Sequence, residues 1–224
     1  MIKHIIQNIT FNAIFILLLF VPAGTLAWPQ GWIFLILFDG CSIATGIWLS
    51  KVDPALLAAR MKSPFSPEQR PHDRRIMAAL MVVFCAWPAF MGLDARGLGW
   101  SHTPLWAQAI GAVLILIGFW AWSRVLRANS FAAVTIQLQP ERGQTVISTG
   151  PYAYVRHPMY AFTLFLLVGA PLLLGSLWGL MGIVVTMPLM ALRALGEEAM
   201  LMDGLPGYRA YAEKVRYRFV PGIW

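Results

Sequence analysis

The sequence predicts an all-α integral membrane protein: a helical bundle of four spans plus a C-terminal helix-turn-helix hairpin, about five to six transmembrane helices. Three observations predict this class. Hydrophobic residues make up 58% of the 224 residues, charged residues only 12%, and the mean hydropathy is +0.65, which is outside the range of soluble globular domains. The apolar runs are about 20 residues long, enough to cross a ~30 Å hydrocarbon core. Lys and Arg lie between these runs rather than within them.

The first two expected spans are residues 5–27 and 32–49, joined by the tight link Trp28-Pro29-Gln30-Gly31. Thr25-Leu26-Ala27 resembles a signal-peptidase site, so a cleaved signal is an alternative to a retained first helix. We favour a retained helix because the second apolar run follows at once.

Two polar loops alternate with two further expected spans. The first loop contains one short helix and four prolines, and the second ends at a Pro-containing turn. In chain order, these segments are the loop 51–75, the span 76–93, the link 94–103, the span 104–125 and the loop 124–157.

The distribution of Lys and Arg predicts the orientation of the spans. If the spans alternate, both polar loops and the C-terminal tail lie on one side, and only Arg96 lies on the other. Basic loops face the cytoplasm in membrane proteins. We therefore expect a protein of a bacterial inner (plasma) membrane with its active site facing the cytoplasm. The formal charge of +7 then indicates contact with membrane lipids rather than with nucleic acid.

The apolar stretch 158–192 is too long for one untilted crossing, because 35 helical residues reach roughly 52 Å at about 1.5 Å each. Gly169, Pro171 and Gly175-Ser176 interrupt its middle. We therefore expect a helical hairpin whose second helix returns to the cytoplasmic face. A single crossing would instead place the five basic residues that follow the stretch on the outer side of the membrane.

The stretch Ser148–Tyr160 combines a Gly150-Pro151 turn with Arg156 and His157 immediately before Pro158, a residue that suits the first turn of a helix. Cations beside the amides of a helix N-terminus can hold an anionic group. They can equally be an interfacial anchor, flanked here by tyrosines.

A continuing helix after residue 192 would place Arg193 and Glu197 one turn apart, with Glu198 beside them. These residues form either an ordinary interfacial ion pair, followed by an amphipathic tail helix, or part of a polar cluster. In the second case the hairpin return brings them next to Arg156 and His157.

Several motifs occur in the order found in one family. They are Asn129-Ser130-Phe131, Gly143-Gln144-Thr145, Gly150-Pro151-Tyr152, Arg156-His157-Pro158-Met159-Tyr160, the RxxxEE of Arg193 to Glu198, and Pro206-Gly207-Tyr208 with Tyr211. Over roughly residues 124–224 the chain resembles the isoprenylcysteine carboxyl methyltransferase family, and it shares part of the pattern with the phospholipid N-methyltransferases.

The resemblance implies a methyltransferase that depends on S-adenosylmethionine and transfers a methyl group to a lipophilic or membrane-permeant acceptor: an isoprenylcysteine-like carboxylate, a thiol or a lipid amine. It implies a cofactor site and two catalytic residues, Arg193 and Glu198, that face the acceptor; exchanged roles for Glu197 and Glu198 are an alternative. The implied cofactor-binding residues are Gln144, Tyr152, Arg156, His157, Pro158, Tyr160, Glu197, Tyr208 and Tyr211.

Gln144 departs from the family, many of whose members have His there. Glutamine can hydrogen-bond but carries no charge, which puts this one cofactor contact in question. The other residue types suit the chemistry. Arginine and histidine suit a carboxylate, Glu197 suits hydroxyl or amino groups, and tyrosine faces suit a sulfonium. No metal site is expected.

We expect two parts in the chain: residues 1–123, the N-terminal helices with their loop 51–75, and residues 124–224, the methyltransferase core. Two other functions are compatible with the sequence: a membrane NADPH-dependent reductase of the steroid-reductase type and a small non-catalytic membrane transporter. The expected partners are a lipophilic small-molecule substrate and membrane lipids. The sequence identifies neither the acceptor nor the oligomeric state.

Overall fold

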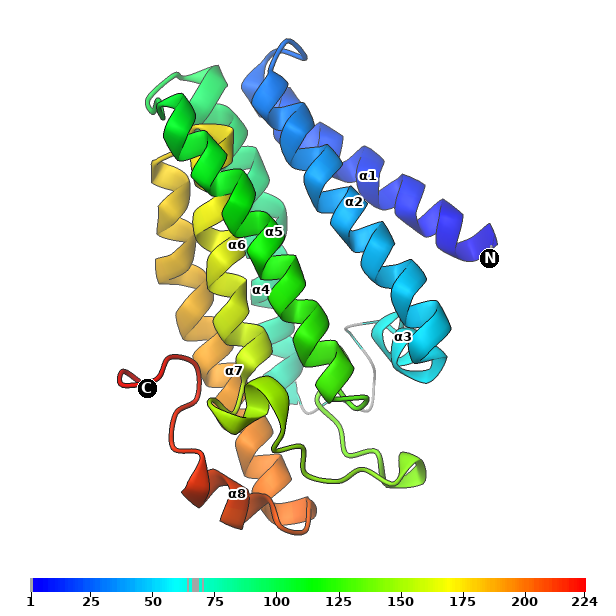
Figure 1. Cartoon of the computed structure of the whole chain (residues 1–224). Coiled ribbons are helices and arrows are strands. Elements are labelled where there is room, and N and C mark those ends of the chain that lie inside the picture. Colours follow the sequence, from blue (N-terminus) through cyan, green and yellow to red (C-terminus); the bar gives the residue numbers. More distant parts are fainter. Residues whose placement is uncertain (1, 64, 66–68, 70) are drawn as a thin grey trace. The chain divides into compact units, whose positions relative to one another are not determined.

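The computed structural model describes residues 2–63, 65, 69 and 71–224, and side chains from Asn12 onward. Pro64, Pro67 and Arg70 of the first polar loop lie outside the described residues. The described part of the chain forms α-helices and no strands (Figure 1). The α-helices are α1 (Ile2–Ala23), α2 (Pro29–Val52), α3 (Pro54–Arg60), α4 (Pro71–Gly92), α5 (Leu105–Ala128), α6 (Pro158–Leu174), α7 (Gly182–Gly204) and α8 (Tyr208–Lys214).

The predicted all-α membrane class is confirmed. Four helical stretches are long and apolar enough to cross a membrane: Pro29–Val52, Pro71–Gly97, Leu105–Ala128 and Trp178–Gly204. Two shorter apolar helices, Asn12–Ala23 and Pro158–Leu174, accompany them. The short helix expected in the first polar loop is α3, and the expected C-terminal hairpin is formed by α6 and α7, joined through the 3₁₀ turn η4 (Trp178–Met181).

The break in the hairpin lies at Gly175-Ser176, the last of the three interruptions that the sequence showed. Helix α6 runs through Gly169 and Pro171 and ends at Leu174. The carbonyl of Pro171 accepts hydrogen bonds from the amides of Gly175 and Ser176. Gly175 has a φ of +86°, which glycine adopts at little cost, so this residue turns the chain.

The chain divides into two compact units, each built from three segments. The first unit comprises Met1–Ile43, Leu80–Ile117 and Phe165–Thr186; the second comprises Ala44–Ala79, Gly118–Leu164 and Met187–Trp224. Helices α2, α4, α5, α6 and α7 supply residues to both units. The expected division at residues 123 and 124 stays a prediction.

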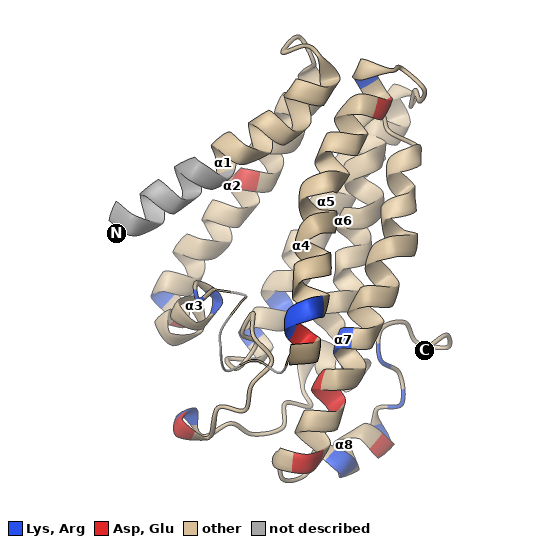
Figure 2. Ribbon diagram, turned by 180° about the vertical axis from the view of Figure 1, so that it is seen from behind, with Lys and Arg blue, Asp and Glu red and all other residues tan. Residues whose placement is uncertain are grey.

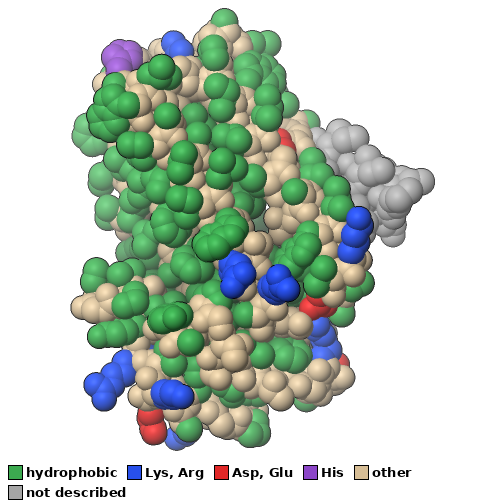
Figure 3. Space-filling view, viewed as in Figure 1, with side chains coloured by type: hydrophobic (Ala, Val, Ile, Leu, Met, Phe, Trp, Pro, Cys, Tyr) green, Lys and Arg blue, Asp and Glu red, His purple; other side chains and the backbone are tan. Residues whose placement is uncertain are grey.

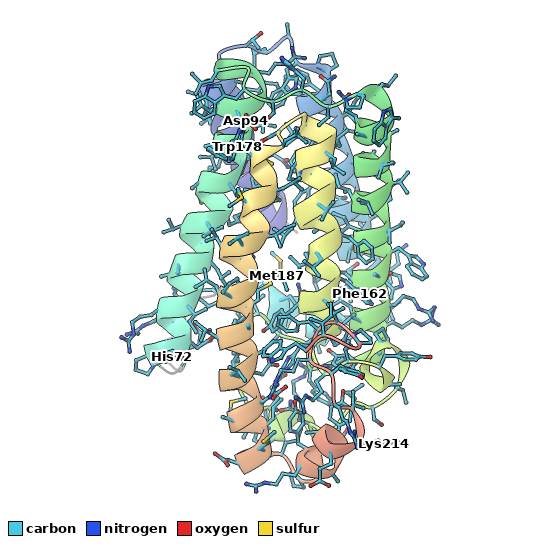
Figure 4. The ribbon with its side chains drawn as sticks, turned by 90° about the vertical axis from the view of Figure 1, so that its left-hand side faces the viewer. His72, Asp94, Phe162, Trp178, Met187 and Lys214 are labelled. Carbon is cyan, nitrogen blue, oxygen red and sulfur yellow. The ribbon has the colours of Figure 1, made fainter. Side chains whose placement is uncertain are left out.

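Close helix contacts and single hydrogen bonds hold the first unit together. A Cβ on Gly111 of α5 would lie 2.6 Å from the carbonyl oxygen of Gly169 on α6, so the absence of side chains permits this backbone approach. The buried Ser176 hydroxyl donates to the Asp94 carboxylate at 2.6 Å, and Asp94 lies in the π-helical turn η1 (Leu93–Gly97). Figure 4 labels Asp94 and Trp178 at this end of the unit.

Three apolar clusters organise the second unit. One cluster is centred on Leu49, Leu56 and Leu126, and packs α3 against the ends of α2 and α5. Another joins α6, α7 and the C-terminal tail through Ala161, Ala194 and Phe219; Figure 4 labels two of its flanking residues, Phe162 on α6 and Met187 on α7. The third cluster includes Met200, Leu201, Tyr208 and Tyr211 and fixes α8 to the end of α7.

Exposed apolar side chains mark the surfaces that would face lipid. On α5 they include Leu105, Trp106, Ile110, Val113 and Trp120, and hydrophobic side chains dominate this face in Figure 3. The charged residues of α5, Arg124 and Arg127, lie near its C-terminal end, and Figure 2 shows charged residues gathered around α8 and the adjoining part of α7. Solvent would disfavour such continuous apolar area, whereas hydrocarbon accommodates it.

Candidate active site

The loop before α6 holds Arg156 and His157 in place through its backbone. A 3₁₀ turn, η3 (Gly150–Ala153), leads into it, and Pro158 begins α6 as the sequence predicts. The amide of Arg156 donates to the Tyr217 carbonyl at 2.9 Å, and the amide of His157 donates to the Arg218 carbonyl at 2.9 Å. The C-terminal tail therefore pairs with this loop along the backbone and orients both side chains.

Glu198 of α7 lies among three cationic or potentially cationic side chains. Its Oε1 is 2.9 Å from Nε of Arg156 and 3.0 Å from Nε2 of His157, and its Oε2 accepts a hydrogen bond from Nε of Arg218 at 3.0 Å. The Arg156 contact is an ion pair without hydrogen-bond alignment at Nε, while Nη1 of Arg156 donates to the Ala212 carbonyl. Only 4% of the Glu198 side chain is exposed, so its carboxylate is fully engaged within the protein.

Glu197, the neighbouring acid, is the more accessible of the two. The hydroxyl of Tyr160 donates to its Oε2 at 3.0 Å, and Nδ1 of His157 lies 3.7 Å from the same oxygen, beyond hydrogen-bond distance. The His157 and Tyr160 rings stack with centroids 5.5 Å apart. Because 30% of the Glu197 side chain is exposed, this carboxylate can still accept hydrogen bonds from a ligand.

Arg193 pairs with Asp73 at the start of α4, which corrects the expectation that Glu197 would be its ionic partner. Nε of Arg193 donates to Oδ1 of Asp73 at 3.0 Å, and Nη2 donates to the carbonyl of Val134. Gln69 donates to Oδ2 of the same aspartate at 3.0 Å. Tertiary packing supplied a closer acid than the helical i,i+4 neighbour, so the guanidinium is held from two sides.

Tyrosines form another side of the site. The Tyr211 hydroxyl donates to the Tyr152 carbonyl at 2.8 Å, and Asn129 donates from Nδ2 to the Tyr152 hydroxyl at 2.9 Å. The rings of Tyr208 and Tyr211 lie with centroids 5.6 Å apart. Burial raises the pKa of Tyr152, Tyr208 and Tyr211 above the ordinary tyrosine value, so all three phenols are neutral at physiological pH.

These groups surround one cavity of about 220 Å³ in the second unit. Nine of the eleven residues proposed from the sequence line it: Gln144, Tyr152, Arg156, His157, Tyr160, Arg193, Glu197, Tyr208 and Tyr211. Pro158 and Glu198 do not: Pro158 is fully buried at the start of α6, and Glu198 is engaged with its three partners. Oε1 of Gln144 accepts a hydrogen bond from the amide of Gln139 at 2.8 Å, so Gln144 shapes its own loop.

The polar residues of the site that were not singled out as site residues from the sequence include Arg60, Asp73, Asn129 and Arg218. Asp73 lies three residues before the apolar run that begins at Ile76, and Asn129 belongs to the Asn-Ser-Phe motif, so the sequence offered a local indication of both. Arg60 and Arg218 looked like any of the basic residues near the membrane surface. Only the fold distinguishes them, because it brings α3 and the C-terminal tail to the cavity region.

The apolar helices and the cavity lined by charged and polar side chains define the class of an integral membrane protein with a candidate ligand site. Within it, residues 106–205 match the sequence model of a family described as phospholipid methyltransferase, just under half of the chain. The match confirms the resemblance to membrane methyltransferases of the isoprenylcysteine and phospholipid type, and it covers every lining residue between Asn129 and Leu205. A comparison with curated proteins finds no significant match. The family match and the apolar helices together support a membrane methyltransferase.

Proposed function

We propose that the protein transfers a methyl group from S-adenosylmethionine to a lipophilic acceptor that reaches the cavity from the membrane. One observation carries the proposal. Arg156 and His157, before α6, and Glu197, on α7, line one cavity inside the segment that matches the methyltransferase family. Nothing in the described residues favours the reductase or transporter alternatives over this one.

The lining of the cavity fits such a cofactor. The Thr135 hydroxyl is buried and has no hydrogen-bond partner in the described part of the chain, although the residue lines the cavity. A buried polar group of this kind is costly unless a ligand or water satisfies it. The cavity also offers one partly exposed carboxylate, four tyrosines and a histidine. These groups match the amino, hydroxyl, sulfonium and aromatic parts of S-adenosylmethionine.

Our proposal assigns binding residues on two sides. Tyr152, Arg156, His157 and Tyr160, with the helix start at Pro158, would hold the cofactor from the α6 side. Glu197, Tyr208 and Tyr211 would hold it from the α7 and α8 side, and Gln144 would support the loop between them. When bound, S-adenosylmethionine supplies an electrophilic methyl group on a sulfonium.

The residues of the chain would accelerate transfer by positioning and by excluding water. Methyl transfer is an in-line displacement, in which the acceptor lone pair forms the new bond to carbon as the sulfur–carbon bond breaks. Most of the barrier reduction then comes from holding the two reactants at attack distance in a dry cavity. Arg193, fixed by Asp73 and Val134, is proposed to orient an anionic acceptor with its remaining N–H groups.

The two acids receive different roles in this proposal. The family resemblance implied catalysis by Glu198, with exchanged roles for the two acids as an alternative, yet the Glu198 carboxylate already faces Arg156, His157 and Arg218. We therefore propose that Glu198 positions the two residues before α6. Glu197, which lines the cavity, would accept the proton when the acceptor is an amine.

The surroundings of the site support a lipophilic substrate and membrane lipids as partners. Exposed apolar residues cover the long helices, and the basic loops point to an active site on the cytoplasmic side of a bacterial inner membrane. We propose residues 124–224 as the methyltransferase core. An acceptor entering laterally would then need no aqueous path.

Calorimetry on the detergent-purified protein tests this function. Wild type should bind S-adenosylmethionine and S-adenosylhomocysteine, and His157→Ala and Glu197→Ala should each weaken binding by about 10-fold or more, the loss of a charge-assisted hydrogen bond. Glu213→Ala, which removes an exposed acid of α8, is the matched control and should bind as wild type does. No binding to wild type, or no methylated product with any lipid extract, would contradict the proposal.

A further inference from the structure

Arg60 lies at the C-terminal end of α3, a short helix with a well-defined position. Asp53 caps the helix by accepting a hydrogen bond from the Leu56 amide, and Pro54 occupies its first turn. Leu56 is completely buried in the cluster with Leu49 and Leu126. The helix therefore has a fixed position in the second unit, and Arg60 extends from it into the lining of the cavity.

The guanidinium of Arg60 contacts only neutral groups in the described part of the chain. Its Nη1 donates to the Ala132 carbonyl at 3.0 Å and lies 3.7 Å from the sulfur of Met159. No described carboxylate lies within ion-pair distance of it. Nε and Nη2 have neither a hydrogen-bond partner nor an ion-pair partner among the described residues, which leaves two adjacent N–H groups free.

The other two arginines that line the cavity have different surroundings. Arg193 is paired with Asp73, and Arg156 is paired with Glu198. Burial lowers the pKa of Arg60, which expresses the cost of removing this charge from water without a paired acid among the described residues. A guanidinium in such a site is usually compensated by an anion.

We infer that Arg60 binds a carboxylate or phosphate oxyanion of the ligand that occupies the cavity. The planar fork of arginine matches both anions through two parallel hydrogen bonds. The inference rests on the proposed function and deepens it, because it assigns an anionic group to a ligand. Arg60 lies outside residues 106–205, so the family match does not assign it a role.

Two sources of the oxyanion are compatible with this geometry. One is the amino-acid carboxylate of the methyl donor, and the other is a phosphate or carboxylate on the lipid acceptor. Both would place their oxygens near Nη2 and Nε of Arg60. The experiment must therefore separate donor from acceptor.

The test uses Arg60→Met, which keeps the length of the side chain and removes its charge, and three probes measured by calorimetry in detergent. S-adenosylhomocysteine carries the carboxylate, 5′-methylthioadenosine lacks it, and dodecyl phosphate represents an anionic lipid headgroup. Arg127→Met, which removes an exposed arginine at the end of α5 outside the cavity, is the matched control. Arg60→Lys keeps the charge without the fork.

We expect Arg60→Met to weaken one oxyanion probe by about 10- to 100-fold, the usual effect of losing a hydrogen bond to a charged group. Weaker binding of S-adenosylhomocysteine, with unchanged binding of 5′-methylthioadenosine, would identify the oxyanion as the carboxylate of the donor. Weaker binding of dodecyl phosphate alone would identify it as a group on the acceptor. In either case Arg60→Lys should recover part of the loss, and Arg127→Met should show none.

Unchanged affinity for both oxyanion probes would overturn the inference. Equal weakening of all three probes would also overturn it, because it would mean that Arg60 only supports the shape of the cavity. A wild type that binds dodecyl phosphate but no adenosyl ligand would contradict the proposed function, while the comparison of Arg60→Met with Arg127→Met would still test Arg60.

Discussion

The two units of the protein use polar residues in different ways. In the first unit, polar contacts such as Ser176 with Asp94 and Trp87 with the Gly179 carbonyl each tie one helix segment to its neighbour. In the second unit, charged side chains from far-apart segments converge on a cavity, and most pair with one another. Buried charges stabilise a fold poorly, because desolvation offsets their attraction. The comparison teaches that the first unit is organised for packing and the second for a ligand.

The largest effect should follow from Glu198→Ala in the second unit. The substitution leaves Arg156, His157 and Arg218 without the acid that faces all three of them. Breaking a buried ion pair costs about 3–5 kcal/mol, and the loop before α6 should lose its orientation as well. Thermal unfolding in detergent and calorimetry with S-adenosylhomocysteine should both register the loss.

Asp203→Ala is the control for that experiment, because its contact with Arg209 is exposed and 3.7 Å long. Exposed pairs contribute about 0–1 kcal/mol. If Glu198→Ala unfolded no earlier than Asp203→Ala and bound the cofactor equally well, the charge network would not organise the second unit.

Asp73→Asn should have the next largest effect and should act on the acceptor side of the site. The amide keeps the shape but loses the ion pair with Nε of Arg193, worth about 1.5–3 kcal/mol for a hydrogen bond to a charged group. With Arg193 less firmly held, the KM for the acceptor should rise while the affinity for S-adenosylhomocysteine stays the same. Affinities and kinetics measured on one preparation check this split.

An equal loss of cofactor affinity in Asp73→Asn would contradict the separation of donor and acceptor sides. Asp203→Asn, the same chemical change at an exposed position, should alter neither quantity.

Gly111→Ala tests the first unit, where packing rather than ligand binding is expected to suffer. The new Cβ would lie 2.5 Å from the Leu173 amide nitrogen and 2.6 Å from the Gly169 carbonyl oxygen, both backbone atoms that cannot move independently. Overpacking of this kind costs about 1–3 kcal/mol. The unfolding temperature should fall, and the affinity of the folded protein for S-adenosylhomocysteine should not change.

Gly40→Ala is the matched control in the same unit, because nothing lies within 4 Å of its new Cβ. Replacing an unhindered helical glycine by alanine stabilises a helix by roughly 0.5–1 kcal/mol. If Gly111→Ala weakened ligand binding directly, the contrast between the two units would be wrong.

The helices and most of the cavity residues could be predicted from the sequence because the patterns that indicate them are local. Apolar run length predicts the membrane class, and the ordered motifs around Arg156, His157 and Glu197 predict a shared site. The partner of Arg193 could not be predicted, because Asp73 is 120 positions away and the choice between Asp73 and Glu197 depends on tertiary packing. Arg60 was hidden for the same reason, because its sequence neighbours resemble any basic loop. Gly169 looked like a helix break, although in the fold it permits a close helix contact.

The smallest expected effect is on alkaline pH dependence and concerns the neutral tyrosines of the second unit. Burial raises the pKa of Tyr208, so its phenol keeps its proton in the folded protein at a pH where the unfolded chain loses it. This contribution to stability is fully present below the unfolded value near pH 10 and is lost as the pH rises through the folded value. Each unit of difference corresponds to about 1.4 kcal/mol.

Tyr208→Phe should therefore flatten the fall of the unfolding temperature between about pH 9 and pH 11, the range in which an ordinary tyrosine begins to ionise. Tyr217→Phe, which removes the phenol of an exposed tyrosine in the same unit, provides the comparison for the chemical change itself. The first unit has no tyrosine at all, so a change of slope on Tyr208→Phe reports on the second unit. Identical slopes for Tyr208→Phe and wild type would mean that the phenol does not titrate differently in the folded chain, and that the second unit is wetter around α8 than its buried residues indicate.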